Sequence, residues 1–198
     1  MNAAILLPEP CRTGGMPLRD ALSSRRSVRR FSPRRFDLKD GGDLQLLSDL
    51  LWAAFGPVSP KRRSAPSSHN WQEIDLYALL PEGAFRYDAA GNSLQPVSEE
   101  DLRAASGAQD YVGTAAMEIA YVACLDKVVG KTGRGLAQAI YADTGFIAQN
   151  VYLFCTSVGL ATVVRAMVPK ETLAPRLGLD SSREITLVQT VGWKSEEK

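Results

Sequence analysis

The stretch LAQAIYADTGFIAQNVYLFCTSV, from Leu136 to Val158, gives the first indication of how this chain folds. Its apolar residues recur at the spacing of an α-helix, so it predicts the longest helix of the protein. One apolar stripe holds Ile140, Ile147, Val151, Phe154 and Val158, and a second holds Tyr141, Ala148, Tyr152 and Cys155. A helix that is apolar on two faces is enclosed by protein, so we expect this one in a core or at a subunit interface.

Shorter elements on both sides of this helix predict an α+β fold. We expect strands at residues 74–80, 117–125, 161–168 and 184–193, and a hairpin that joins residues 85–87 to residues 94–97. We expect shorter helices at residues 18–26, at 43–55 with Asp43 as N-cap, from Ser98 onward by capping-box logic, and at 169–177. Helices and strands mix without a regular βαβ repeat, which indicates a sheet with helices packed around it.

Length and cysteine use indicate a single cytoplasmic domain. We expect this domain to span all 198 residues, with residues 1–17 as an extended N-terminal arm. No stretch is long enough to span a membrane, and the first residues lack the basic start of a signal peptide. The three cysteines, Cys11, Cys124 and Cys155, form no C-x-x-C pair, which is typical of reduced thiols.

The composition excludes several kinds of chemistry. The single histidine, His69, cannot build a zinc site of His and Cys ligands, and no G-x-S-x-G turn accompanies it to form a hydrolase triad. Neither a Walker loop nor a dinucleotide-binding G-x-G-x-x-G occurs, and a net charge of +1 argues against a nucleic-acid binder. If the protein is an enzyme, we expect no metal site and a bound organic cofactor that carries the chemistry.

An arginine-rich segment, Arg25-Arg26-Ser27-Val28-Arg29-Arg30-Phe31, concentrates guanidinium groups around one hydroxyl. Arginine binds phosphate through a rigid fork of donors, and serine adds a short hydrogen bond, so the segment favours a compact phosphate-bearing ligand. A solvated helix face with exposed arginines is the alternative. The continuation Ser32–Arg35 resembles a short nucleic-acid or targeting patch, and we assign Arg34 and Arg35 to a solvated surface.

A second polar segment, Ala65-Pro66-Ser67-Ser68-His69-Asn70-Trp71-Gln72, precedes a predicted strand. Its hydroxyls, carboxamides and backbone donors suit a polar ligand with hydroxyls and ring carbonyls. Taken alone, the segment fits an ordinary turn better than a binding loop. Its presence together with the arginine-rich segment favours a binding loop.

Four segments, in this order, resemble motifs of the nitroreductase family of FMN-dependent oxidoreductases. They are Arg25–Phe31 (R-x-S-x-R), Pro66–Gln72 (P-S-x-x-N-x-Q), Asp143–Asn150 (D-x-G-x-x-x-Q-N) and Gly159–Val164 (G-L-x-T). Val191-Gly192-Trp193 also resembles the family's last strand, and the resemblance covers about residues 18–194. The hairpin around Tyr87-Asp88 and the stretch Leu51–Ala54 are most similar to the branch that contains SagB-type dehydrogenases.

The resemblance implies a homodimer with a central, mostly antiparallel sheet, a long buried central helix and two FMN molecules at the subunit interface. The implied FMN-binding residues are Arg25, Arg26, Ser27 and Arg29; Pro66, Ser67, Ser68 and Asn70; Gln109; and Val164, Arg165 and Ala166. The resemblance implies that Arg25, Ser27 and Arg29 bind the phosphate and the ribityl chain and that Arg26 contributes main-chain or ring contacts. It also implies that the second group reaches the flavin bound mainly by the other subunit. Gln109 approaches the pyrimidine edge, and the last group lies along the flavin ring with one amide directed at N5. Either Lys194 or Arg165 supplies a further cation at the phosphate, or the N-terminal arginines hold the phosphate alone.

The implied activity is a ping-pong oxidoreductase reaction. NAD(P)H passes a hydride to flavin N5, and a small organic acceptor such as a nitroaromatic compound or a quinone then takes the electrons. This chemistry needs no dedicated acid, base or nucleophile, and Arg165 could stabilise the reduced flavin. The alternatives are a SagB-like dehydrogenase that oxidises a ring or amine-type substrate, a flavin-storage protein without turnover, and an anion or nucleic-acid binder that uses only the arginine-rich segment.

Overall fold

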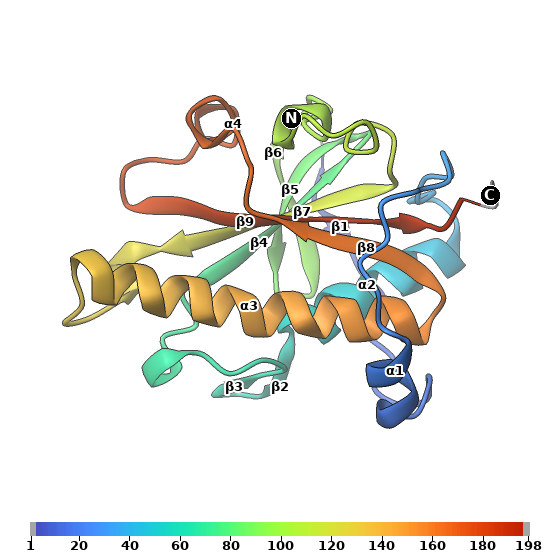
Figure 1. Cartoon of the computed structure of the whole chain (residues 1–198), viewed down its shortest axis with the longest axis horizontal. Helices are drawn as coiled ribbons and strands as arrows, with labels where there is room; N and C mark the ends of the chain where they lie inside the picture. Colours follow the sequence, from blue (N-terminus) through green and yellow to red (C-terminus); the bar gives the residue numbers. More distant parts are fainter. Residues whose placement is uncertain (1–2, 196–198) are drawn as a thin grey trace.

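A seven-stranded antiparallel sheet forms the centre of the structure, a computed structural model that describes residues 3–195 (Figure 1). The strands lie in the order β1-β6-β5-β4-β7-β9-β8, and each neighbouring pair is antiparallel. They are β1 (Ile5–Leu6), β4 (Ile74–Leu80), β5 (Gly83–Asp88), β6 (Ser93–Ser98), β7 (Met117–Cys124), β8 (Leu160–Arg165) and β9 (Arg183–Trp193). The predicted α+β fold and the predicted hairpin, now β5–β6, are confirmed.

The middle of the sheet is buried on both faces, which explains its continuous apolar sequence. Every residue of β7 is buried. Ile119 and Tyr121 pack in the core on one face, whereas Ala120 and Val122 pack in the core on the other. Because successive side chains of a strand point to opposite faces, this one strand serves two cores.

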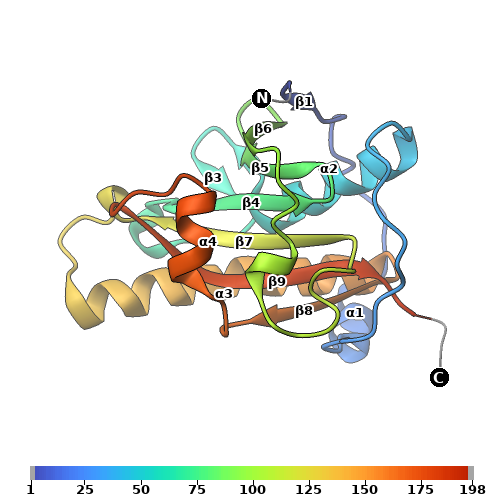
Figure 2. The same cartoon turned by 90° about the horizontal axis from the view of Figure 1, so that it is seen from above.

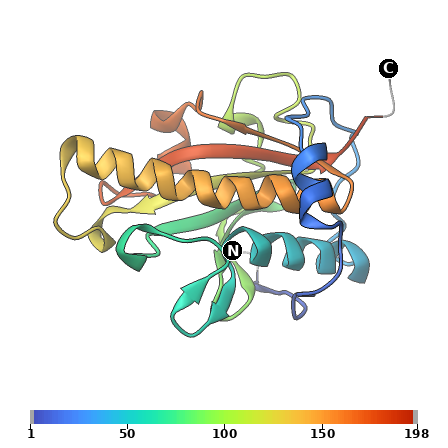
Figure 3. The ribbon, with the colours of Figure 1, turned by 60° about the horizontal axis from the view of Figure 1, so that its bottom comes forward.

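Helices cover the two faces of the sheet unequally. The helices α1 (Leu18–Ser24), α2 (Gly41–Phe55) and α3 (Gly133–Ser157) lie on one face, and α4 (Lys170–Arg176) lies on the other with the 3-10 turn η2 (Ala104–Ser106) (Figures 1 and 2). Figure 3 shows α3 crossing its face of the sheet beside α2 and α1. In the described part of the chain, no helix has both the length and the apolar character to cross a membrane.

The helix α3 begins three residues before the predicted start and ends at Ser157. Ile140, Ile147, Val151 and Cys155 are fully buried against the sheet and α2. On the opposite side, Phe146 keeps 48% of its surface exposed. A single chain therefore covers only one side of its longest helix.

The two helices near the N-terminus differ from prediction at their ends. The helix α1 ends at Ser24 because Arg25 already has an extended backbone, with ψ of 126°. The helix α2 begins at Gly41, and Asp40 rather than Asp43 is its N-cap, with its carboxylate accepting from the N–H groups of Gly42 and Asp43 at 2.9 Å. Asp43 has another role, because its carboxylate accepts from Asp37 N at 3.0 Å and from Arg34 Nη2 at 2.8 Å.

The helix predicted from Ser98 is wrong. The segment forms only the single 3-10 turn η2, because its polar groups are bonded to support a buried arginine instead of a helix. Asp101 accepts from the backbone N–H and the side chain of Arg103, and Arg103 Nη1 donates to Ala115 O at 2.5 Å. Arg103 is only 1% exposed, so these bonds compensate a buried charge. Nothing in the sequence pattern indicates that this arginine is buried.

The longer connections contain small elements of their own. The loop between α2 and β4 contains a small hairpin, β2 (Pro57–Ser59) with β3 (Arg62–Arg63), and the 3-10 turn η1 (Ser68–Asn70). A third turn, η3 (Leu125–Lys127), follows β7. Within the expected N-terminal arm, β1 pairs with β6 and forms the edge of the sheet, and residues 1 and 2 lie outside the described part.

Candidate active site

The arginine-rich segment is extended chain along the free edge of β8, so the alternative of a solvated helix face is wrong. Val28 N donates to Thr162 O at 3.0 Å, and Phe31 forms a bridge with Lys194 beyond β9. Arg26 folds back, and its Nη1 donates to Ser23 O at 3.0 Å and to Arg25 O at 2.8 Å. The segment is therefore held by its backbone, which leaves several guanidinium groups at the surface.

Tyr152 of α3 connects this segment with β8. Its Oη lies 2.9 Å from Ser27 Oγ and accepts a hydrogen bond from Val164 N at 3.0 Å. The guanidinium of Arg25 lies 5.2 Å from the centre of the Tyr152 ring, within range of a cation–π contact. In the sequence, Tyr152 belongs to an apolar stripe of the predicted helix, and its hydroxyl within that stripe is the only local sign of this role.

An open hollow of about 730 Å³ lies next to the arginine-rich segment. It is lined by Arg29, Arg30, Phe31, Gln109, Asp110, Tyr111, Thr114 and Ser195. The rings of Phe31 and Tyr111 are in contact, with centres 5.4 Å apart. The fold thus brings Arg29 together with Gln109, two predicted site residues that are far apart in the sequence.

Arg165 is buried within the chain, where it forms an ion pair with Glu118 of β7. Arg165 Nη2 lies 2.5 Å from Glu118 Oε2, and Nη1 donates to Ser106 O at 2.9 Å and to Gln109 Oε1 at 3.3 Å. Burial raises the pKa of Glu118 to about 7, and Arg165 and Thr190 act against this rise. A Cβ atom added at Gly107 would lie 2.1 Å from Nη1 of Arg165, which is too close. The approach of the Arg165 guanidinium to the backbone therefore requires glycine at position 107.

The end of β8 presents the backbone predicted to face the flavin ring. In an antiparallel edge strand, N–H groups point away from the sheet at every second residue. Val164 N is such an outward group and is bonded to Tyr152, and Ala166 follows two residues later, in the bend directly after β8. Ala166 is exposed, and Met167 beside it is 80% exposed.

The Pro66–Gln72 loop is held against α3 by a buried carboxylate. Asp143, which is 1% exposed, accepts from Ser68 N at 2.7 Å and from Ser68 Oγ at 3.2 Å. Ser67 Oγ accepts from Gln72 N at 3.0 Å, and Asn70 Nδ2 donates to Lys61 O at 3.0 Å. The polar side chains of this loop therefore build the loop itself.

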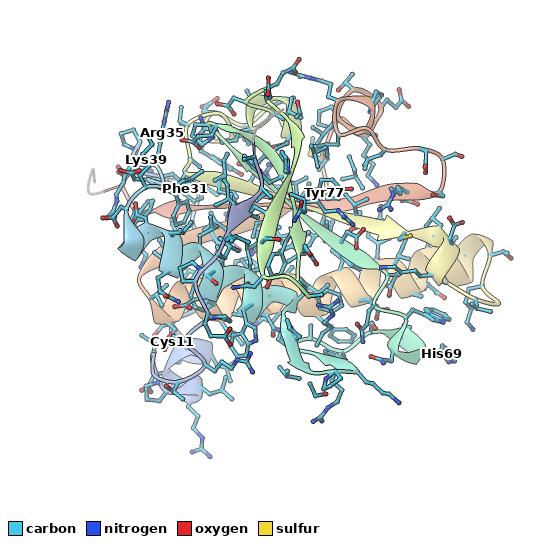
Figure 4. The ribbon with its side chains drawn as sticks, turned by 180° about the vertical axis from the view of Figure 1, so that it is seen from behind. Cys11, Phe31, Arg35, Lys39, His69 and Tyr77 are labelled. Carbon is cyan, nitrogen blue, oxygen red and sulfur yellow. The ribbon has the colours of Figure 1, made fainter. Side chains whose placement is uncertain are left out.

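The loop and the arginine-rich segment do not meet within one chain. Asp143 and Tyr152, which contact them, are nine residues apart on α3, and this spacing corresponds to about 13.5 Å along a helix. Figure 4 shows His69 of the loop and Phe31 of the arginine-rich segment on opposite sides of the molecule. One chain therefore brings together the arginine-rich segment, Gln109 and the Val164–Ala166 segment. The Pro66–Gln72 loop lies apart from them.

Comparison with known proteins identifies the family. The family model described as "Nitroreductase family" matches residues 22–193, which is most of the chain. The chain belongs to the nitroreductase family. This membership makes it an oxidoreductase, and it confirms the resemblance that the four sequence motifs carried.

Individual relatives agree with this assignment. A solved structure from Ralstonia eutropha, named as a nitroreductase, is 36% identical, with a TM-score of 0.89 over 98% of this chain and 90% of that one. A protein of Methanocaldococcus jannaschii, also named as a nitroreductase, is 27% identical over 74% of this chain and 76% of its own length. The Escherichia coli microcin synthetase complex contains a chain that shares the fold, with 19% identity and a TM-score of 0.73 over 96% of this chain and 78% of that one.

Proposed function

We propose that this nitroreductase-family chain uses FMN to pass hydride or electrons from NAD(P)H to a small organic acceptor, such as a nitroaromatic compound or a quinone. The observation that carries the proposal is the meeting of Ser27 and Val164 at Tyr152, next to the hollow lined by Arg29 and Gln109. These groups, which include the backbone N–H of Val164, come from separate segments of the chain, and the fold gathers them in one region.

The donors of this region fit FMN. Arg25 and Arg29 supply guanidinium groups for a phosphate dianion, and Ser27 supplies a hydroxyl beside them. Since Gln109 Oε1 accepts from Arg165, the amide nitrogen of Gln109 is left to donate to a ring carbonyl. When bound, FMN supplies the two-electron chemistry, and the protein supplies position and charge.

The ring-binding role falls to backbone groups at the end of β8. We assign the N5-facing amide to Ala166, because Val164 N is already bonded to Tyr152. Arg165 acts as a positioning residue, since its guanidinium is bonded to Glu118 and Ser106 and fixes the strand end beside Gln109. Glu118 compensates the charge of Arg165, so we assign Arg165 only a small part in stabilising reduced flavin.

A second copy of the chain completes the proposed site. The outer side of α3 and the neighbouring α1 expose apolar side chains, with Leu18 64%, Leu22 52% and Phe146 48% exposed. A patch of this kind on a globular protein is typical of an interaction surface. A two-fold partner on this patch would bring its own Ser68 and Asn70 toward the flavin, which accounts for the separation of the loop from the rest of the site.

The proposed location is the cytoplasm, without membrane or nucleic-acid partners. All three cysteines are free thiols, and Cys124 and Cys155 are buried. Arg34 is exposed, as predicted from the sequence, but it is bonded to Asp43 and lies 3.9 Å above the ring of Trp193. That arrangement leaves fewer free cations for a nucleic-acid backbone.

The opposite direction of electron flow is the second candidate. The resemblance of the β5–β6 hairpin sequence to SagB-type dehydrogenases supports oxidation of a ring or amine-type substrate. The two candidates differ in what reduces the flavin. Only the first requires NAD(P)H to do so.

The absorbance spectrum of the purified protein tests both candidates. We expect flavin bands that acid or heat releases into solution and that bleach on anaerobic addition of NAD(P)H. A folded protein that neither contains nor takes up FMN would contradict the proposal. Bound flavin that NAD(P)H leaves oxidised would favour the dehydrogenase, and flavin that no substrate reduces would favour storage.

A further inference from the structure

Glu73 is a buried acid that the proposed site leaves unexplained. It connects the Pro66–Gln72 loop to β4, and its side chain is fully buried. Within residues 3–195, neither of its carboxylate oxygens has a hydrogen-bond partner. A buried carboxylate without a donor is costly, so an arrangement of this kind needs a physical explanation.

Asp143 provides the explanation. Its carboxylate interacts with that of Glu73, and both side chains are buried. Two ionised carboxylates only accept hydrogen bonds, so they cannot satisfy each other unless one of them carries a proton. The pKa of Glu73 is raised to about 7, mainly by burial and also by hydrogen bonding and charge repulsion from Asp143, while the backbone of Glu73 and the charge of Lys127 oppose the rise.

We propose that Glu73 and Asp143 share one proton, and that this proton allows Asp143 to hold Ser68 and with it the Pro66–Gln72 loop in its binding conformation. Protonated Glu73 donates to Asp143, and the Asp143 carboxylate keeps accepting from Ser68 N and Oγ. Both acids are positioning residues, because they act through the loop. The effect on flavin binding rests on the proposed function of that loop.

The loop depends on this anchor because its backbone is strained. His69, Asn70 and Gln72 all have positive φ, at 50°, 55° and 50°. Residues other than glycine rarely adopt this conformation, and they keep it only where surrounding contacts enforce it. Ser68, directly before the strained residues, receives two such contacts from Asp143.

The charged groups around Glu73 decide what a pH experiment can show. Asp143 acts from α3 and Lys127 from η3, where Lys127 Nζ also donates to Gln72 O at 3.1 Å and lies 3.6 Å from Asp75. Asp75 is in turn bonded to Arg183 at 2.8 Å. On the loop, His69 contacts the ring of Trp71 at 4.7 Å, and histidine ordinarily titrates in the same pH range as Glu73 does here. His69 therefore needs its own control.

The sign of the pH effect follows from the direction of the shift. An ordinary glutamate titrates near 4.5, whereas Glu73 in the folded protein titrates near 7. The shared proton is therefore fully present at low pH and is lost as pH rises through about 7. Ionised Glu73 then repels Asp143, the hold on Ser68 weakens, and flavin binding weakens with it.

The experiment compares FMN release from the loaded protein at pH 6 and pH 8.5, followed by the fluorescence of free FMN. We expect the wild-type dissociation constant to rise about tenfold, the effect of losing one charge-assisted hydrogen bond. Glu73→Gln keeps a donor toward Asp143 at every pH, so its dissociation constant should stay low and flat. His69→Gln, the control, should keep the wild-type pH profile.

A second measurement separates the carboxyl pair from the proposed function. The readout is the indole NMR signal of Trp71 in flavin-free full-length protein, assigned with the variant Trp71→Phe. In wild type and in His69→Gln, this signal should shift with a midpoint near pH 7. In Glu73→Gln and in Asp143→Asn, it should not shift. If Trp71 shifts this way while FMN affinity stays constant, the pair is real and the loop does not bind flavin. A wild-type Trp71 transition that survives in Glu73→Gln would overturn the proposal.

Discussion

The hydroxyl of Tyr152 accepts a hydrogen bond from the backbone N–H of Val164, 3.0 Å away. This bond ties the longest helix to the edge strand β8 and fixes which amides of that strand remain free. The same hydroxyl lies 2.9 Å from Ser27 Oγ, so one side chain links the phosphate-binding candidate to the ring-binding candidate. Tyr152 therefore fixes the position of the arginine-rich segment relative to the end of β8 in the proposed FMN site.

Replacing Tyr152 by phenylalanine should weaken FMN binding. The variant keeps the ring below Arg25 but leaves Val164 N without its acceptor, and an unsatisfied buried donor costs about 1–3 kcal/mol. We expect FMN affinity to fall by roughly tenfold, as measured by fluorescence titration. The matched control is Tyr141→Phe on the same helix, whose hydroxyl accepts from Lys170 Nζ at 2.7 Å, and its FMN affinity should not change. Equal losses in both variants would contradict the role of Tyr152.

Replacing Arg25 or Arg29 by alanine should weaken binding of FMN but not of riboflavin. Each guanidinium is expected to make a charge-assisted bond to the phosphate dianion, which contributes about 1.5–3 kcal/mol, or roughly tenfold to a hundredfold in affinity. Riboflavin lacks the phosphate, so it should lose little affinity in the variants. Titration of each variant with both flavins makes the comparison.

Arg35→Ala is the control for the arginine variants. Arg34 and Arg35 are both exposed, but Arg34 is bonded to Asp43, so Arg35 is the simpler control. We expect Arg35→Ala to bind both flavins as the wild type does. If Arg25→Ala and Arg29→Ala weakened riboflavin as much as FMN, the phosphate assignment would be wrong.

The fold was predictable because local patterns and packing agree along most of the chain. The apolar stripes of α3 and the continuous apolar sequence of β7 both reflect burial against neighbouring elements. The helix expected from Ser98 failed because Arg103 is buried there, and a buried arginine is indistinguishable in sequence from an exposed one. Its bond to Ala115 O joins residues that only the folded chain brings together.

The proposed site was predictable from its motifs but not from its supporting side chains. Ser27, Gln109 and Ala166 belong to segments that the family resemblance identified. Glu118 and Glu73 belong to no motif, and each is functional only through a partner 47 or more residues away, as the Glu118–Arg165 bond illustrates. Long-range pairing of this kind has no local signal in one sequence.

Replacing Arg165 by methionine should destabilise the protein strongly. The change leaves Glu118 buried without its cation, and breaking a buried pair costs about 3–5 kcal/mol. The loss should be larger at pH 8 than at pH 5, because burial already raises the pKa of Glu118 and the unpaired acid takes up a proton at the lower pH. Urea unfolding at both pH values measures the effect, and the double variant Arg165→Met with Glu118→Leu should recover part of the stability. A single variant as stable as wild type would show that the pair is not needed for folding.

Replacing Phe146 by aspartate should separate the proposed dimer. Phe146 is 48% exposed on the outer side of α3, and a charge there would be buried without a partner if a second copy covers the helix. We expect sedimentation velocity to show monomers for the variant and dimers for the wild type, with FMN lost along with the dimer because the Pro66–Gln72 loop comes from the other copy. Leu6→Asp on β1 is the matched control, since Leu6 is 76% exposed and lies at the far edge of the sheet from β8. That variant should remain dimeric and flavin-bound, and a dimeric Phe146→Asp protein would place the interface elsewhere.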